Sequence, residues 1–298
     1  MIIIPARIIR QMNRRILFFL LLTLVSGVMA YAPLSTLIAS ASDSGYYSHI
    51  PLIPLVSGYL LFLKRKKIAS ELAYSPRIGL PILIIGIFGY YLNAIQGDRA
   101  NLNNYTAISV FCSLLFWAGS FIFCYGIPSF KKVLFPIFFL LFMIPIPTSV
   151  MERIIYALQV ASTDTTYWLF KAIGIPFHRE GFVFQLPTVS IEVAKQCSGI
   201  RSSLALLITS ILASFLFLQK GWSRVILLAF VFPITVFKNA IRIMTLTLLA
   251  IYVDEGFLTG GFLHKSGGFL FYIPALMIMG GVLVGLRRKE RNRPSIAK

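Results

Sequence analysis

Charge is scarce in this chain of 298 residues, and acidic charge is the scarcest. Only 13% of the residues are charged, ten of them acidic, whereas 57% are hydrophobic. Because a soluble domain averages about a quarter charged residues, a soluble globular protein is excluded. The 26 Phe, 13 Tyr and 3 Trp add to this apolar character. The composition indicates an integral membrane protein with many spans.

The sequence also lacks the short motifs of several enzyme classes. It has no H-E-x-x-H pair, and its three histidines are far apart, which argues against a zinc site. No G-x-S-x-G frames a serine, and no glycine-rich loop suited to phosphate occurs. We therefore expect neither a metal nor a cofactor. No repeat, low-complexity tract or separate soluble domain interrupts the chain, so we expect one integral membrane domain over residues 1–298.

Long apolar stretches predict the spans. A transmembrane helix needs about 20 predominantly apolar residues. On this basis we predict an all-α polytopic protein with about eight transmembrane helices, at residues 16–40, 50–63, 78–95, 105–127, 133–150, 197–219, 225–252 and 263–286.

The basic residues predict the orientation of these spans. Clusters at residues 7–15, 64–77, 131–132, 220–224 and 287–298 all lie on one side if each span crosses once, and most of the ten acidic residues lie on the other. Lys and Arg are enriched in cytoplasmic loops, so both termini are expected in the cytoplasm. The net charge of +18 then reflects topology and some attraction to anionic membrane lipids, and we expect no nucleic-acid partner.

The longest stretch between predicted spans, residues 151–196, is expected on the outer face. Its first half carries apolar residues at helical spacing, which predicts an interfacial amphipathic helix, broken near Thr163–Thr166. Its second half, "GFVFQLPTVSIEVA", alternates with period two around Pro187 and Thr188. This alternation predicts a short β-hairpin before the sixth transmembrane helix.

A cysteine stands where that hairpin meets the sixth span, in "EVAKQCSGIRSS". If the helix starts at Cys197, its thiol faces unpaired N–H groups and the positive end of the helix dipole, which favour the nucleophilic thiolate. Arg201 lies four residues on and would share its face. Cys112 and Cys124, by contrast, fit as small buried hydrophobic residues.

Two more polar groups fall at the same predicted depth. The seventh span holds Arg242 in "KNAIRI", and His264 opens the eighth span in "HKSGG". A thiol, an imidazole and a guanidinium are a nucleophile, a proton shuttle and a cation for a developing oxyanion, the groups that acyl transfer through a thioester requires. His49 and His178 are also expected outside, so the choice of histidine stays open. The expected supporting residues are Arg201, Asn239, Lys238, Glu192 and Ser198.

The motifs "VAKQCSG", "KNAIRI" and "HKSGG", in this order and on these elements, resemble those of the exosortase/archaeosortase family. The stretch "YYSHIPLIPLVSGYLLFLKRKK", residues 46–67, also resembles the early segment of the family, so the similarity runs from about residue 46 to 286. The resemblance implies a membrane cysteine peptidase or transpeptidase with Cys197 as nucleophile, Arg242 as the arginine of the family and His264 as acid/base. The histidine favours the bacterial branch.

The resemblance further implies partners and a location. Such enzymes act on exported proteins whose C-terminal sorting signal, of the PEP-CTERM kind, consists of a short motif, an apolar helix and a basic tail. The expected place is the bacterial inner membrane, with the active site facing the periplasm. Two alternatives stay open: a non-catalytic transporter or polysaccharide-export component, favoured by Pro233 and Lys238 within a span, and a membrane acyl-transfer enzyme or protease that uses Ser198 or water.

Overall fold

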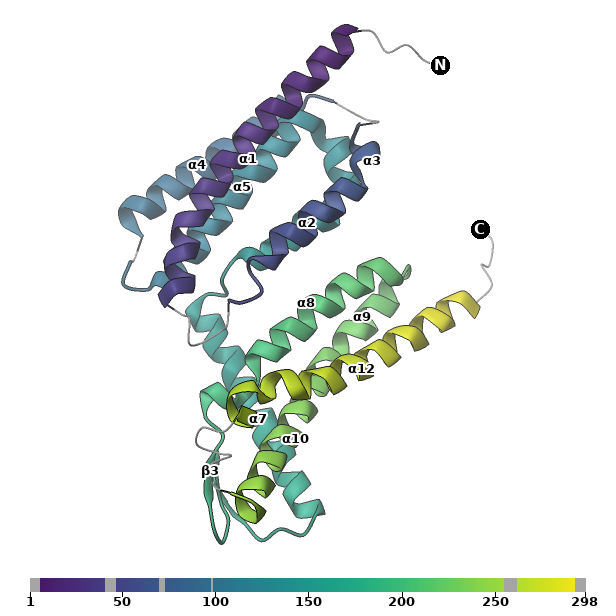
Figure 1. Ribbon diagram of the computed structural model, residues 1–298. Coiled ribbons are helices and arrows are strands. Elements are labelled where there is room, and N and C mark those ends of the chain that lie inside the picture. The colour runs from purple at the N-terminus through teal and green to yellow at the C-terminus, as the bar shows by residue number, and fades with distance from the viewer. Residues whose placement is uncertain (1–5, 41–46, 70–72, 98, 255–261, 293–298) are drawn as a thin grey trace. The chain divides into compact units, whose positions relative to one another are not determined.

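The computed structural model describes residues 6–40, 47–69, 73–97, 99–254 and 262–292, and places their side chains except at 6–14, 40, 69 and 262–269. The protein is mostly helical, at 81%, as predicted. It divides into two compact units, Met1–Thr148 and Ser149–Lys298, each of which forms its own set of packed elements (Figure 1).

The first unit is built on one long helix. Helix α5 packs against both α1 and α4. The α4–α5 contact is very close, because a methyl group added at Gly79, Gly86 or Gly119 would lie 2.5 Å from a backbone nitrogen of the facing helix. Small residues at such a seam are typical of packed membrane helices. The described elements are α1 (Ala6–Ser40), α2 (Leu52–Leu63), α3 (Arg65–Ala69), α4 (Pro76–Gln96), α5 (Leu102–Lys132), α6 (Leu134–Phe139) and η1 (Leu140–Met143).

The second unit joins a small sheet to a group of helices (Figure 1). Its three strands form an antiparallel sheet in the order β1-β2-β3, which leaves β3 at an edge. The elements are α7 (Thr148–Ala172), β1 (His178–Glu180), β2 (Val183–Gln185), β3 (Ser190–Glu192), η2 (Lys195–Ser198), α8 (Ile200–Phe217), α9 (Gly221–Ala229), α10 (Val231–Tyr252) and α12 (Phe262–Asn292).

Two apolar clusters hold this unit together. One joins the sheet to α7 and α10 through Phe170, Phe184 and Ile243, among others. The other joins α8, α9, α10 and α12, with Leu206 and Leu227 almost fully buried in it. The first cluster fixes the sheet against α10, so β3 and the segment after it are held beside that helix.

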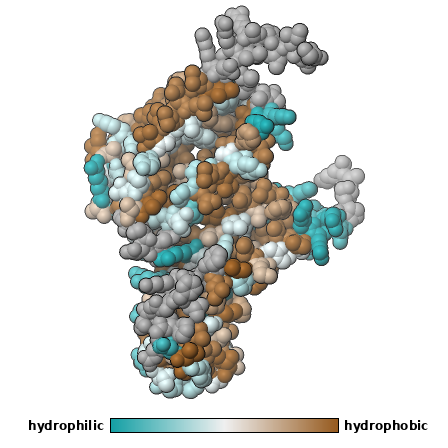
Figure 2. Space-filling model, viewed as in Figure 1, coloured by the Kyte–Doolittle hydropathy of each residue, from teal (hydrophilic) through white to brown (hydrophobic). Residues whose placement is uncertain are grey.

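The helices support a polytopic membrane protein. Six of the described helices are long and apolar enough to span a bilayer, or up to seven if the pair Leu134–Met143 and Thr148–Ala172, bent by 88°, counts as one span. The predicted span 50–63 contains a helix of only 12 residues, and the predicted span 133–150 is interrupted after Met143. A total of eight spans therefore stays a prediction. Figure 2 shows hydrophobic side chains along α8 and α12, with hydrophilic ones gathered at the C-terminal end of α12.

The structure confirms the predicted hairpin and corrects the helix before it. Strands β2 and β3 pair on either side of Pro187 and Thr188, and β1 adds a third strand that the sequence pattern did not indicate. Helix α7 runs unbroken through Thr163–Thr166. The hydroxyls of Thr163 and Thr166 each donate a 2.8 Å hydrogen bond to the carbonyl four residues earlier, so these polar side chains are satisfied within the helix.

Candidate active site

Cys197 lies in a short 3-10 turn between the sheet and α8. This turn, η2, follows β3 directly, and the Cys197 N–H donates to the Ala194 carbonyl at 2.8 Å. Helix α8 begins only at Ile200, because Gly199 adopts a left-handed conformation with φ of 76°. The prediction that the helix starts at Cys197 is therefore wrong by three residues. The thiol stands on a turn just before the helix.

Asn239 on α10 holds this turn in place. Its side chain is fully buried, and its Nδ2 donates to the Cys197 carbonyl oxygen at 2.8 Å and to Ser162 Oγ on α7 at 3.0 Å. A methyl group at Gly199 would lie 2.8 Å from Asn239 Oδ1, so the turn packs directly on the amide. One side chain thus connects α7, η2 and α10.

Arg242 lies three residues after Asn239, and the helical repeat places both on one face of α10. Its guanidinium is close enough for direct electrostatic interaction with Cys197 and with Arg201 near the start of α8. Lys238, on the same helix, is mostly buried and donates to Ser202 Oγ. The start of α8 and this stretch of α10 therefore share a polar, positively charged contact region around the sulfur.

A groove opens beside the thiol. It has a volume of about 200 Å³, and one wall is the edge strand β3 while the other is α10. Cys197 is partly exposed to it, and its floor is apolar. The lining residues are those at 190–193, Cys197, Ile243 and Leu246. An extended peptide is the ligand shape that an edge strand and an apolar wall accommodate together.

The family model described as transmembrane exosortase (Exosortase_EpsH) matches residues 39–281, which is most of the chain. The chain belongs to the transmembrane exosortase family. No curated protein gives a significant match, and neither does any solved structure. The matched region of this exosortase contains the turn with Cys197, the α10 residues around it and the first half of α12.

The serine next to the thiol of this exosortase is inaccessible. Ser198 is fully buried, and its Oγ has no hydrogen-bond partner among the described residues. Cys197, one residue earlier, is partly exposed at the groove. A nucleophile must reach its substrate, so the geometry favours the thiol over the hydroxyl. The sequence does not show that Cys197 is partly exposed while the adjacent Ser198 is buried.

The three histidines of the exosortase lie in different parts of the structure. His264 lies in the first turn of α12, and its side chain is outside the described residues. His178 is exposed on β1, 3.6 Å from Glu180, with β2 between it and the edge strand β3. His49 belongs to the first unit. Of the histidines, only His178 therefore has a described side chain in the unit that carries Cys197.

The remaining predicted supporting residues line the site or lie near it. Glu192 is exposed on β3 and lines the groove. Arg201 is exposed in the first turn of α8. Within the described residues, no group of His, Cys, Asp or Glu could hold a metal ion. Cys112 and Cys124 are buried free thiols, as predicted.

Proposed function

We propose that this exosortase is a cysteine peptidase or transpeptidase that cleaves the C-terminal sorting signal of exported proteins. The observation that carries the proposal is the position of Cys197, partly exposed in a groove between β3 and α10, close to Arg242 and next to a fully buried Ser198. A reactive thiol beside a cation and an extended binding surface is the arrangement that acyl transfer from a peptide needs.

The reaction divides into two balanced steps. The Cys197 thiolate attacks the scissile carbonyl carbon and forms a C–S bond, and the Arg242 guanidinium stabilises the negative oxygen that develops there. The C–N bond then breaks, and His264 gives a proton to the departing amine. A second amine, or water, attacks the thioester carbonyl and gives a proton to the now neutral His264, and the sulfur leaves as thiolate. The product is a new amide or a carboxylic acid.

The edge strand supplies a way to hold the substrate. The Val193 N–H donates to the Phe182 carbonyl at 2.9 Å. Because hydrogen-bonded positions alternate along an antiparallel ladder, Ile191 also faces β2, whereas Ser190 and Glu192 face the free edge. The Ser190 N–H and C=O and the Glu192 N–H point there, while the Glu192 carbonyl already accepts from the Ala194 N–H at 3.0 Å. A substrate segment in extended form pairs with these groups and brings its scissile bond toward Cys197.

The proposed substrate class is the one that membership of the exosortase family implies. The proposed substrate ends in a short motif of the PEP-CTERM kind, an apolar helix and a basic tail, so its helix lies in the bilayer beside the enzyme and its motif meets the groove. The enzyme acts in the bacterial inner membrane with Cys197 at the periplasmic surface. Basic residues at the other end of α8 and α12 support this orientation, since such residues favour the cytoplasmic side.

The test is cleavage of a co-expressed reporter that carries such a signal and an epitope tag. Cys197→Ala abolishes processing, and Cys197→Ser strongly reduces it, because a hydroxyl is a weaker nucleophile than a thiolate. Ser198→Ala is the matched control and keeps processing, since its hydroxyl does not reach the groove. Protein levels in the membrane are compared by immunoblot.

Each contrary outcome points to a specific alternative. If Ser198→Ala stops processing while Cys197→Ala does not, the serine route is right and the thiol proposal is wrong. If neither variant changes processing of a reporter whose cleavage requires this chain, neither side chain is the nucleophile, and a route through water is right. A thioester trapped on Cys197 and released by hydroxylamine identifies the acyl intermediate directly.

A further inference from the structure

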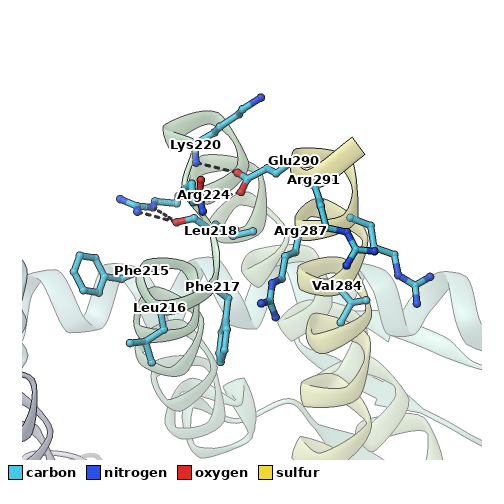
Figure 3. A pocket seen from close by; sticks show the side chains of 12 residues that line it. Phe215, Leu216, Phe217, Leu218, Lys220, Arg224, Val284, Arg287, Glu290 and Arg291 are labelled. Carbon is cyan, nitrogen blue, oxygen red and sulfur yellow. Dashed lines mark hydrogen bonds between the residues drawn. The ribbon is translucent and has the colours of Figure 1, made fainter. Parts of the chain in front are cut away.

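A second cavity lies at the far end of α8 from the thiol. It has a volume of about 890 Å³ and opens between the α8–α9 connection and the C-terminal part of α12 (Figure 3). Helix α8 contains 18 residues, so the two sites are separated by roughly 27 Å along its axis at about 1.5 Å per residue. The cavity is therefore distinct from the proposed active site, and the inference below does not depend on the proposed function.

Basic side chains dominate the lining of this cavity. The lining contains five basic residues and one acidic residue, Glu290. The basic residues are Lys220, Arg224, Arg287, Arg288 and Arg291. Figure 3 shows Lys220 and Arg224 on the side of the α8–α9 connection, and Arg287 and Arg291 on α12. Like charges at such short range repel one another, so an anion bound among them is strongly favoured.

The single carboxylate is already engaged by the backbone. The two Glu290 carboxylate oxygens accept hydrogen bonds from the N–H groups of Gln219 and Lys220, both at 2.9 Å. These bonds tie α12 to the start of α9. Glu290 therefore organises the cavity wall by binding the backbone of the α8–α9 connection, and it also interacts with the side chains of Ser223 and Lys220.

Among the described residues, no acidic side chain lies within 4.0 Å of the α12 arginines in an ion pair. In the described part of the second unit, the ion pairs within 4.0 Å are those of Asp164 with Arg179 and of Glu180 with His178. Arg287 instead has its guanidinium 5.7 Å from the centre of the Phe217 ring. Guanidinium groups bind phosphate oxygens in a bidentate manner, so this group of cations suits a phosphate.

Three apolar side chains of the lining are exposed. Leu216, Phe217 and Val284 line the same cavity and are 50%, 46% and 48% exposed. They lie on α8 and α12, two of the helices long and apolar enough to span a bilayer. A free phosphate would leave this apolar wall uncovered, whereas an acyl chain running along the helices would cover it.

We propose that this cavity is a binding site for an anionic phospholipid, whose phosphate lies among the arginines of α12 and whose acyl chain lies along Leu216, Phe217 and Val284. A lipid with an uncharged group beyond its phosphate fits better than a zwitterionic one, because the ammonium of the latter would approach Arg288 and Arg291. Basic pockets between transmembrane helices bind anionic head groups in this way. The bound lipid joins α12 to the α8–α9 connection, so it stabilises the folded protein.

The experiment measures lipid binding to the full chain, purified in detergent, by native mass spectrometry. Dioleoylphosphatidylglycerol binds more tightly than dioleoylphosphatidylcholine. The triple change Arg287→Gln, Arg288→Gln and Arg291→Gln weakens the former about tenfold or more and leaves the latter unchanged. The matched control removes three exposed charges from the first unit, Lys66→Gln, Lys67→Gln and Arg77→Gln, and keeps the preference. Inorganic phosphate at millimolar concentration does not compete with the lipid.

Several results would overturn the proposal. Equal loss of binding in both triple variants means that general surface charge, and not this cavity, attracts the lipid. Equal affinity for the two lipids shows that the site does not distinguish an anionic from a zwitterionic head group, and competition by inorganic phosphate shows a site for soluble anions instead. If the triple variant does not fold by circular dichroism, the single change Arg291→Gln decides: about threefold weaker binding supports the site, and unchanged binding contradicts it.

Discussion

The Nδ2 of Asn239 donates a 2.8 Å hydrogen bond to the carbonyl oxygen of Cys197, 42 residues earlier in the chain. This bond fixes the backbone that carries the thiol, while the other hydrogen of the same amide binds Ser162 Oγ. Asn239 therefore acts on Cys197 through the backbone. It is a positioning residue that is not itself part of the groove lining.

Asn239→Asp is expected to slow processing by roughly tenfold to a hundredfold, the cost of leaving a buried carbonyl without its donor. The shape of the side chain is kept, but an oxygen replaces the donor and faces the Cys197 carbonyl. The measurement pairs the processing rate with the rate at which iodoacetamide alkylates Cys197 in membranes, because a displaced turn changes both.

The control for this prediction is Ser162→Ala, which removes the other partner of the amide and leaves the bond to Cys197. Its effect should stay within a few fold. Equal losses in the two variants would show that Asn239 contributes only general stability. Normal processing by the Asn239→Asp variant would show that Asn239 does not position Cys197.

Gly199→Ala should impair processing more than a left-handed backbone alone explains. Its φ is 76°, and the added methyl group would lie 2.8 Å from Asn239 Oδ1. Gly174→Ala is a matched control, because φ is 74° there and nothing lies within 4 Å of the added carbon. Both changes cost about 1–2 kcal/mol of backbone strain. Only the change at Gly199 disturbs the cysteine turn, and processing assays at equal protein level compare the two.

Proline at the free edge of β3 tests the proposed pairing of the substrate. Ser190→Pro removes an N–H that points away from β2, so processing falls while the melting temperature stays near that of the parent. Ser190→Ala controls for the side chain. Ile191→Pro removes an N–H that pairs with β2 and lowers the melting temperature as well. Unchanged processing by Ser190→Pro would exclude edge pairing at this position.

Arg242→Gln should reduce processing by about a hundredfold or more, as expected when a donor to a developing oxyanion is lost. Arg242→Lys keeps the charge but not the planar fork, and an intermediate rate is expected. The control is Lys238→Gln, which removes a neighbouring charge that binds Ser202 Oγ. If the loss at Lys238 matches that at Arg242, the local field and not a specific contact is responsible.

Periodic patterns in the sequence correctly predicted the strands β2 and β3. The alternation around Pro187 and Thr188 predicted β2 and β3, because one face of the sheet packs on α7 and α10. The three residues of β1 are too few to show such a pattern. The predicted break near Thr163 is wrong, because the hydroxyls of this stretch bond within the helix, which a list of polar residues does not reveal.

The site was less predictable from the sequence than the helices. The residue types around the thiol indicated acyl transfer, and the structure brings Arg242 close to Cys197. The contact between Asn239 and the cysteine turn depends on how α10 packs, so no local pattern contains it. The left-handed conformation of Gly199 was likewise not predictable, and because of it α8 begins at Ile200, after Cys197. The register of the sheet, which decides that the backbone N–H of Ser190 is at the free edge, is also not visible in the alternation alone.

The free edge of β3 has a consequence for what the enzyme can process. Main-chain pairing selects for an unfolded stretch before it selects for any side chain, since the hydrogen bonds are the same for every residue except proline. If the proposed pairing operates, a folded cargo domain has to be separated from its membrane anchor by a linker long enough to lie flat along the strand. Shortening that linker should protect a cargo from release even when its recognition motif is intact.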